Sequence, residues 1–133
     1  MTDAAPRHQQ RERALSLLYE AELKGEDPRQ VVEGLAVPPD PYVRTLIEQA
    51  AGSREEADRR ISGASVGWPL DRMAVVDRLV LRLAVAELLS PSGPPAAVVI
   101  DEAVELVKEY STDESGGFVN GILSTISADI GPR

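Results

Sequence analysis

The segment DRMAVVDRLVLRLAVAELL, residues 71–89, constrains the fold more than any other part of the chain. Its apolar side chains cover almost the whole circumference of a helix, which is typical of a helix buried on most sides. Asp71, Arg78 and Arg82 lie within about 40° of one another at 100° per residue and form a narrow polar strip. We expect the segment to be a central helix. We expect its two arginines to pair with intrachain carboxylates, either Asp71 or those of the last two helices.

The rest of the chain also follows helical spacing, and no segment is typical of a strand. Turn residues separate the predicted helices. Gly25, for example, ends one helix, and Asp27 with Pro28 starts the next. The expected helices are 7–24, 27–35, 42–61, 71–89, 94–110 and 111–126, the third loosened at Gly52-Ser53. The sequence therefore predicts an all-α fold of six to seven helices, with two small bundles around the central helix. We expect 1–133 to be one domain, subdivided near 62–70.

Several function classes are disfavoured by composition. The chain has no Cys, which excludes disulfides, thiol catalysis and Cys-ligated zinc, and it has a single His, His8. One His argues against a His-based metal site or a Ser-His-Asp triad. No apolar stretch reaches the roughly 18 residues of a membrane span, and the polar N-terminus is not a signal peptide. We expect a cytoplasmic protein that is not an enzyme and has no cofactor or metal.

The charge distribution leaves two interpretations of the N-terminus open. The net charge of −8 argues against non-specific binding of nucleic acid, which depends on neutralising phosphates. Arg7, Arg11 and Arg13 nevertheless fall within seven residues, opposed only by Glu12. They are either an RNA-contacting arm or a solvated first helical turn, and charge alone favours the second interpretation.

The stretch ESGGFVNGIL, residues 114–123, contains glycines at unusual places for a helix. Ser111 and Glu114 fit a capping box, which places Gly116 and Gly117 near the start of the last helix. Their backbone N–H groups would then be free to bind a phosphate. The adjacent Phe118 is suited to stacking on an unpaired base.

Gly117 and Gly121 are four residues apart and share a helix face. Glycines at this spacing predict a close crossing with a neighbouring backbone. Asn120 would then be buried and would hold a nearby loop through hydrogen bonds. On this interpretation Gly121→Leu would overpack the crossing and destabilise the fold by several kcal/mol.

Three segments carry a family resemblance. PPAAVVIDEAVELVKEYSTDESGGFVNGIL (94–123), VDRLVLRLAVAEL (76–88) and RERALSLLYEAEL (11–23) resemble the NusB family of bacterial transcription antitermination factors. The resemblance implies an all-helical fold without enzymatic activity. It also implies a heterodimer with ribosomal protein S10, called NusE in this role, that binds the boxA element of nascent RNA. This assembly joins the elongating RNA polymerase with other Nus factors, notably on ribosomal RNA operons.

The resemblance also assigns an RNA site. The family's arginine-rich arm falls on Arg7 through Arg11, where His8, Gln9 and Gln10 replace further arginines. The RNA-facing aromatics fall on Tyr19 and Phe118, and the acidic positions near RNA and partner fall on Asp77 and Glu114. Gly117 stands where the family often has a basic residue. Because the chain is acidic, NusE would supply positive charge to a composite surface.

Alternatives remain open for single residues and for the whole chain. Tyr19 is otherwise a core aromatic, and Asp77 is otherwise solvated or paired with Arg78. The RNA site requires the N-terminal arginines and the start of the last helix to meet on one surface. The chain is otherwise a homodimeric interaction module with a masked RNA surface. It also resembles the NusB-like domain of an RNA cytosine methyltransferase, although it has no catalytic Cys and no room for a Rossmann domain.

Overall fold

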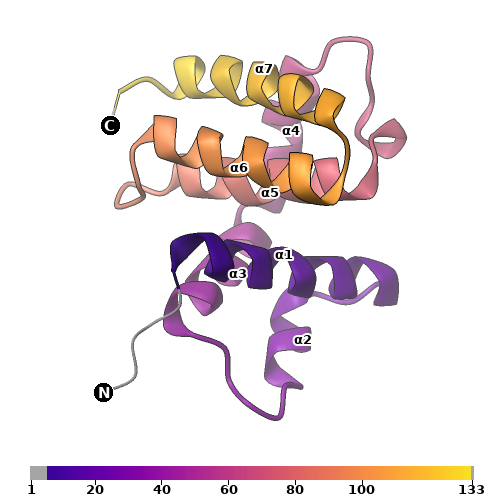
Figure 1. Ribbon diagram of the computed structural model, residues 1–133, viewed down its shortest axis with the longest axis vertical. Coiled ribbons are helices and arrows are strands. Elements are labelled where there is room, and N and C mark those ends of the chain that lie inside the picture. Colours follow the sequence, from indigo (N-terminus) through magenta and orange to yellow (C-terminus); the bar gives the residue numbers. More distant parts are fainter. Residues whose placement is uncertain (1–5, 133) are drawn as a thin grey trace.

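The computed structural model describes residues 6–132 and is entirely helical there, apart from turns and loops (Figure 1). The described residues form seven α-helices and one 3₁₀ turn, which confirms the all-α class. They are α1 (Arg7–Lys24), α2 (Pro28–Glu33), α3 (Pro41–Gly52), α4 (Arg54–Ala64), η1 (Leu70–Arg72), α5 (Val75–Leu89), α6 (Ala96–Tyr110) and α7 (Asp113–Ile130). None of these helices is long and apolar enough to cross a membrane.

The helices form two groups that share α5. Helices α1, α2 and α3 pack on one another, and α4, α6 and α7 surround α5 on its other side (Figure 1). The chain passes from one group to the other at Ser53, between α3 and α4. The passage thus lies before α4 and not in the loop near 62–70, where the sequence predicted the subdivision. Because α4 packs on α5 and α7, the loop after α4 connects helices of the same bundle.

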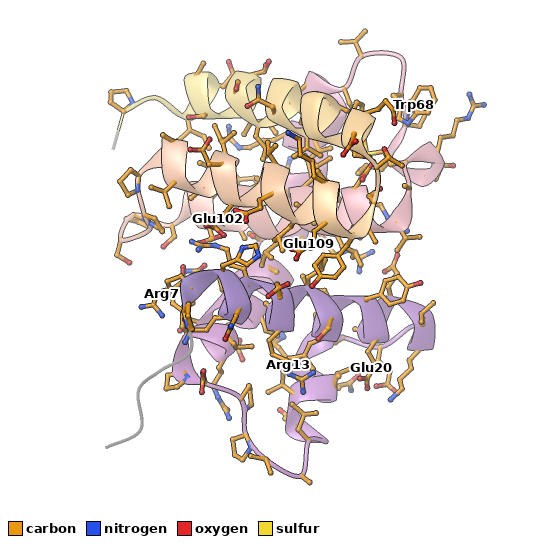
Figure 2. The ribbon with its side chains drawn as sticks, in the orientation of Figure 1. Arg7, Arg13, Glu20, Trp68, Glu102 and Glu109 are labelled. Carbon is orange, nitrogen blue, oxygen red and sulfur yellow. The ribbon has the colours of Figure 1, made fainter. Side chains whose placement is uncertain are left out.

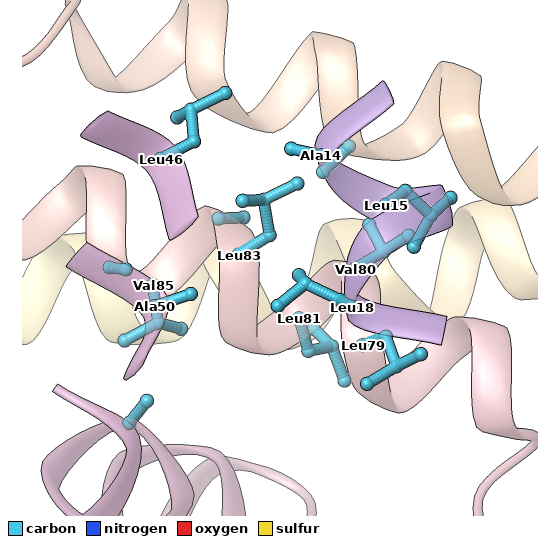
Figure 3. Packing of buried hydrophobic residues seen from close by; sticks show 14 of the residues in the cluster. Ala14, Leu15, Leu18, Leu46, Ala50, Leu79, Val80, Leu81, Leu83 and Val85 are labelled. Carbon is cyan, nitrogen blue, oxygen red and sulfur yellow. The ribbon is translucent and has the colours of Figure 1, made fainter. Parts of the chain in front are cut away.

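Helix α5 is the centre of the core, as the sequence predicted. Ten of its 15 residues are buried, so it has contacts on nearly every side. Figure 3 shows its aliphatic side chains between those of α1 and α3. The labelled members are Leu79, Val80, Leu81, Leu83 and Val85 of α5, Ala14, Leu15 and Leu18 of α1, and Leu46 and Ala50 of α3.

The two arginines of the polar strip, Arg78 and Arg82, form ion pairs with other residues than those predicted. Helix α5 begins at Val75, and Asp71 lies apart from it on η1. Arg78 donates a hydrogen bond of 2.9 Å to Glu22 of α1, and Arg82 donates one of 2.8 Å to Asp58 of α4. Intrachain ion pairs are confirmed, but neither involves Asp71 or the last two helices. The two arginines instead attach the central helix to one helix of each bundle.

One predicted helix is broken in two. The segment 42–61 forms α3 and α4, separated at Ser53, whose φ of −108° and ψ of 11° interrupt the helix. Gly52, the last residue of α3, is exposed and has a low helix propensity, which favours a break there. This break lets α4 leave the first bundle.

Candidate nucleic-acid interface

The first turn of α1 presents one exposed cation. The guanidinium carbon of Arg7 lies 3.7 Å from the centroid of the Tyr42 ring of α3, which is a cation–π contact. A cavity of about 400 Å³ opens beside these two side chains and extends to the loop between α5 and α6. Arg7 is thus held in position but remains accessible to an anion.

Arg11, one turn later, is not accessible. Its Nε and Nη2 atoms donate to the two carboxylate oxygens of Glu87 at 3.0 and 2.9 Å, and the two side chains are 3% and 4% exposed. Nη2 also donates to the Tyr42 hydroxyl, which itself donates to Glu87 at 2.9 Å. The side chain of Arg11 faces α5 and is satisfied by a carboxylate, so its contact with RNA stays a prediction that would require this ion pair to open.

The surroundings of this network shift the pKa values of Arg11 and Tyr42. Burial by itself would lower the pKa of Arg11, but the hydrogen bonds and charge of Glu87 raise it. Burial raises the pKa of the Tyr42 phenol, and the neighbouring Glu87 carboxylate raises it further. Arg11 therefore stays charged and the Tyr42 phenol stays protonated through the physiological range, and the network acts as structure.

The other end of α1 carries an aromatic cavity. Tyr19 and Tyr110 are 40% and 49% exposed, so the alternative of a core position for Tyr19 is wrong. The two rings border a cavity of about 310 Å³ with Val76 at the start of α5. Its remaining lining residues are Glu12, Leu15 and Ser16. Exposed aromatic rings beside an apolar floor suit the stacking of an unpaired base.

Hydrogen bonds fix the wall of this cavity. The Tyr110 hydroxyl donates a short hydrogen bond to the carboxylate of Glu12, which raises the pKa of Tyr110 to about 12. Ser16, another lining residue, accepts a hydrogen bond of 3.3 Å from the exposed Arg13. Sequence reasoning did not place Tyr110 in the site, since the residue belongs to no motif that points to RNA.

The first turn of α7 differs from the predicted phosphate seat. The helix begins at Asp113 and is capped by Thr112, whose Oγ1 accepts from the Ser115 amide at 3.1 Å. The capping box of Ser111 and Glu114 is therefore wrong by one residue. Gly116 and Gly117 become the fourth and fifth helical residues, beyond the amides that lack an intrahelical acceptor.

The glycines of α7 have different surroundings from those predicted. Gly116 is buried, and a Cβ there would lie 2.7 Å from Cε of Lys108, whose chain covers it. Gly117 and Gly121 are exposed, and a Cβ on either would meet nothing within 4 Å. Asn120 is also exposed. The predicted close crossing is therefore wrong, because this side of α7 faces outward.

Asp77 is a buried link between helices. Ser115 Oγ donates 2.8 Å to its Oδ2, which joins the start of α5 to the first turn of α7. Asp77 is 7% exposed, so a solvated position and a pair with Arg78 are wrong, whereas its contact with RNA or partner stays a prediction. Glu114 is exposed on the same turn, and Phe118 is half-buried against the core.

The predicted site residues do not all meet. Arg7 and Tyr19 are separated by twelve residues of one helix, about 18 Å at 1.5 Å per residue. Arg7 lies at the left end of α1 in Figure 2, whereas Figure 1 shows α7 beginning at the right end of the molecule. The predicted meeting of the arginine arm and the start of α7 is therefore wrong. The first turn of α7 is instead linked through Ser115 to Asp77, which is the neighbour in sequence of the cavity residue Val76.

Comparison with known proteins identifies the family. The NusB family model matches residues 8–128. The chain belongs to the NusB family. It is 47% identical to the transcription antitermination protein NusB of Saccharopolyspora erythraea, over 96% of this chain and 89% of that protein. It is 44% identical to NusB of Acidothermus cellulolyticus, over 90% of this chain and 85% of that protein.

Solved structures of NusB proteins have the same fold. T. maritima NusB is 38% identical with a TM-score of 0.85, over 96% of this chain and 94% of that chain. A crystal structure of the antitermination factors NusB and NusE in complex with dsRNA contains a chain that is 34% identical, with a TM-score of 0.75. That match covers 92% of this chain and 96% of the other.

Proposed function

We propose that this chain is a transcription antitermination factor that binds RNA together with NusE, ribosomal protein S10. The proposed RNA element is boxA, and the assembly would join elongating RNA polymerase with other Nus factors in the cytoplasm. The chain would act by binding rather than by catalysis. The observation that carries the proposal is the similarity along nearly the whole chain to NusB, including the NusB found with NusE and dsRNA.

The tyrosine cavity is the proposed base-binding surface of the chain. Tyr19 and Tyr110 offer exposed rings that line the cavity together with the apolar side chains of Leu15 and Val76. Stacking on aromatic rings together with contacts to phosphate is how proteins bind single-stranded RNA. Glu114, Gly117 and the free part of Phe118 would extend this surface along α7.

The proposed role of NusE follows from charge. The chain carries a net charge of −8, and its exposed cations on α1 are few. RNA affinity depends on neutralised phosphates, so the chain alone is expected to bind weakly. A basic partner on the acidic body would supply the missing positive charge. Arg7, at the far end of α1, would be a second phosphate contact, separate from the tyrosine cavity.

Substitution of the two tyrosines tests the proposal. Tyr19→Ala and Tyr110→Ala are each expected to weaken boxA binding by the chain–NusE mixture by about 1–3 kcal/mol, the usual contribution of one stacked base. Trp68→Ala is the matched control, since Trp68 is an aromatic residue of 51% exposure that does not line the cavity. Fluorescence anisotropy of a labelled RNA measures all three, with circular dichroism to verify the fold. Equal affinity for the wild type and both tyrosine variants would remove the cavity from the RNA surface.

A further inference from the structure

His8 is the single His of the chain, and both of its ring nitrogens face carboxylates. Nδ1 lies 2.9 Å from Glu102 and Nε2 lies 3.3 Å from Glu109, both on α6. An ionised carboxylate only accepts hydrogen bonds, so each nitrogen must carry a proton to make both contacts. The geometry therefore fits the imidazolium cation, because a neutral ring would turn one lone pair toward a carboxylate.

More acidic groups surround the ring. Glu105 of α6 lies 4.0 Å from Nδ1, and Glu12 of α1 lies 3.9 Å from Nε2 and also accepts from Tyr110. Four carboxylates thus face one imidazole. From the other helices packed on α1, Tyr42 of α3 and Glu87 of α5 are engaged by Arg7 and Arg11. The charge of Arg11 also acts on Glu102, the first partner of His8.

These groups connect the two bundles. Helix α1 packs on α2, α3 and α5, whereas α6 packs on α5 and α7. In Figure 2, Glu102 and Glu109 lie between α6 and α1. The seam between these two helices, which we define by His8, Glu12, Glu102, Glu105 and Glu109, is thus bridged by polar side chains.

We propose that His8 is a proton-operated clasp: the charged ring holds the first half of α1 against α6, and loss of its proton loosens this seam. A neutral His8 would leave four carboxylates close together without a cation among them, and their mutual repulsion would favour separation of the helices. The clasp goes beyond the proposed function, since it requires neither RNA nor NusE.

The direction of the effect follows from the titration of the ring. The hydrogen bond to Glu102 raises the pKa of His8 above its ordinary 6.5, burial opposes the shift, and Glu109 and Glu105 add to it. Because the pKa is raised, the contribution of the clasp to stability is fully present below pH 6.5 and is lost as pH rises through the raised pKa. The seam is therefore closed in mildly acidic conditions and open in alkaline ones.

Proton NMR of the untagged full chain tests the charge state, because one His gives one unambiguous imidazole signal. The titration midpoint is expected above 6.5, and Glu102→Gln is expected to lower it. Glu55→Gln is the matched control, since Glu55 is exposed on α4 away from the ring. A midpoint at or below 6.5, or one that Glu102→Gln leaves unchanged, would overturn the proposal.

Hydrogen exchange tests the opening of the seam. Protection of the α1 amides, corrected for intrinsic exchange, is expected to fall severalfold as pH passes the His8 midpoint. In His8→Gln, which keeps hydrogen-bonding groups without the charge, this step should be absent. The amides of α4 serve as an internal reference in both proteins. Identical pH profiles of α1 protection in the two proteins would overturn the clasp even if the NMR midpoint is raised.

Discussion

Replacement of Arg11 by Ala should destabilise the fold strongly. The substitution removes one partner of an ion pair whose side chains are 3% and 4% exposed. The substitution takes away the two hydrogen bonds that the buried Glu87 carboxylate accepts from Arg11 and leaves the one from the Tyr42 hydroxyl. Removing one member of a buried pair costs about 3–5 kcal/mol. That loss is a large share of the roughly 5–15 kcal/mol by which domains of this kind are stable.

Urea denaturation measures this loss and separates it from an effect of charge. Arg7→Ala is the matched control, because it removes an arginine one turn earlier that is exposed and stacked on Tyr42. It should cost about 0.5–1 kcal/mol, the value of an exposed cation–π contact. The double variant Arg11→Met with Glu87→Leu removes both charges and should recover most of the stability, since apolar replacement of a buried pair is often neutral.

Two results would refute this reasoning. The first is a cost for Arg11→Ala that equals that of Arg7→Ala, which would mean that Arg11 is not buried in solution. The second is a double variant no more stable than the single one, which would mean that the uncompensated Glu87 charge is not the cause. In either case contact of Arg11 with RNA would no longer require a buried ion pair to open.

Three further predictions concern single contacts. Gly121→Ala should stabilise α7 by about 0.5–1 kcal/mol in thermal or urea unfolding, because a Cβ there meets nothing within 4 Å; a loss would restore the close crossing. Ser115→Ala should cost about 1–3 kcal/mol by removing the donor to buried Asp77, and a change below roughly 0.5 kcal/mol would contradict that link. Glu12→Gln should lower the pKa of Tyr110 from about 12 in an ultraviolet titration, whereas an unchanged alkaline midpoint would show that the hydrogen bond is not formed in solution.

The features that local sequence determines were predictable. The apolar circumference of 71–89 predicted the central helix, and α5 within it is buried on most sides. Gly25 ends α1 with a φ of 67°, and Asp27 caps α2 by accepting from the Arg29 amide. In each case the physical cause lies within a few residues of its effect.

The features that depend on distant residues were not predictable. Arg11 meets Glu87, which is 76 positions away, and no local pattern distinguishes a buried arginine from an RNA-contacting one. His8 likewise meets carboxylates on α6, 94 and 101 positions away. Such pairs follow from the way two helices pack, which a single sequence does not specify.

The orientation of α7 is an intermediate case. Its buried residues, Val119, Ile122, Leu123 and Ile126, form one stripe, and the opposite side carries Gly121 and other small or polar residues. A strict use of helical periodicity would have placed Gly121 outside. The spacing of Gly117 and Gly121 predicted the close crossing, but the apolar stripe determines which side of α7 is buried.

The dependence of RNA binding on NusE tests the central claim most directly. Labelled boxA RNA would be titrated with the chain alone, with NusE alone and with an equimolar mixture, at several salt concentrations. We expect the mixture to bind most tightly, with an affinity that falls steeply as salt increases. Each neutralised phosphate of a single strand contributes about −0.7 to the slope of the logarithm of the binding constant against the logarithm of the salt concentration. Binding by the mixture that is no tighter than binding by NusE alone would contradict the claim that this chain forms part of the RNA surface.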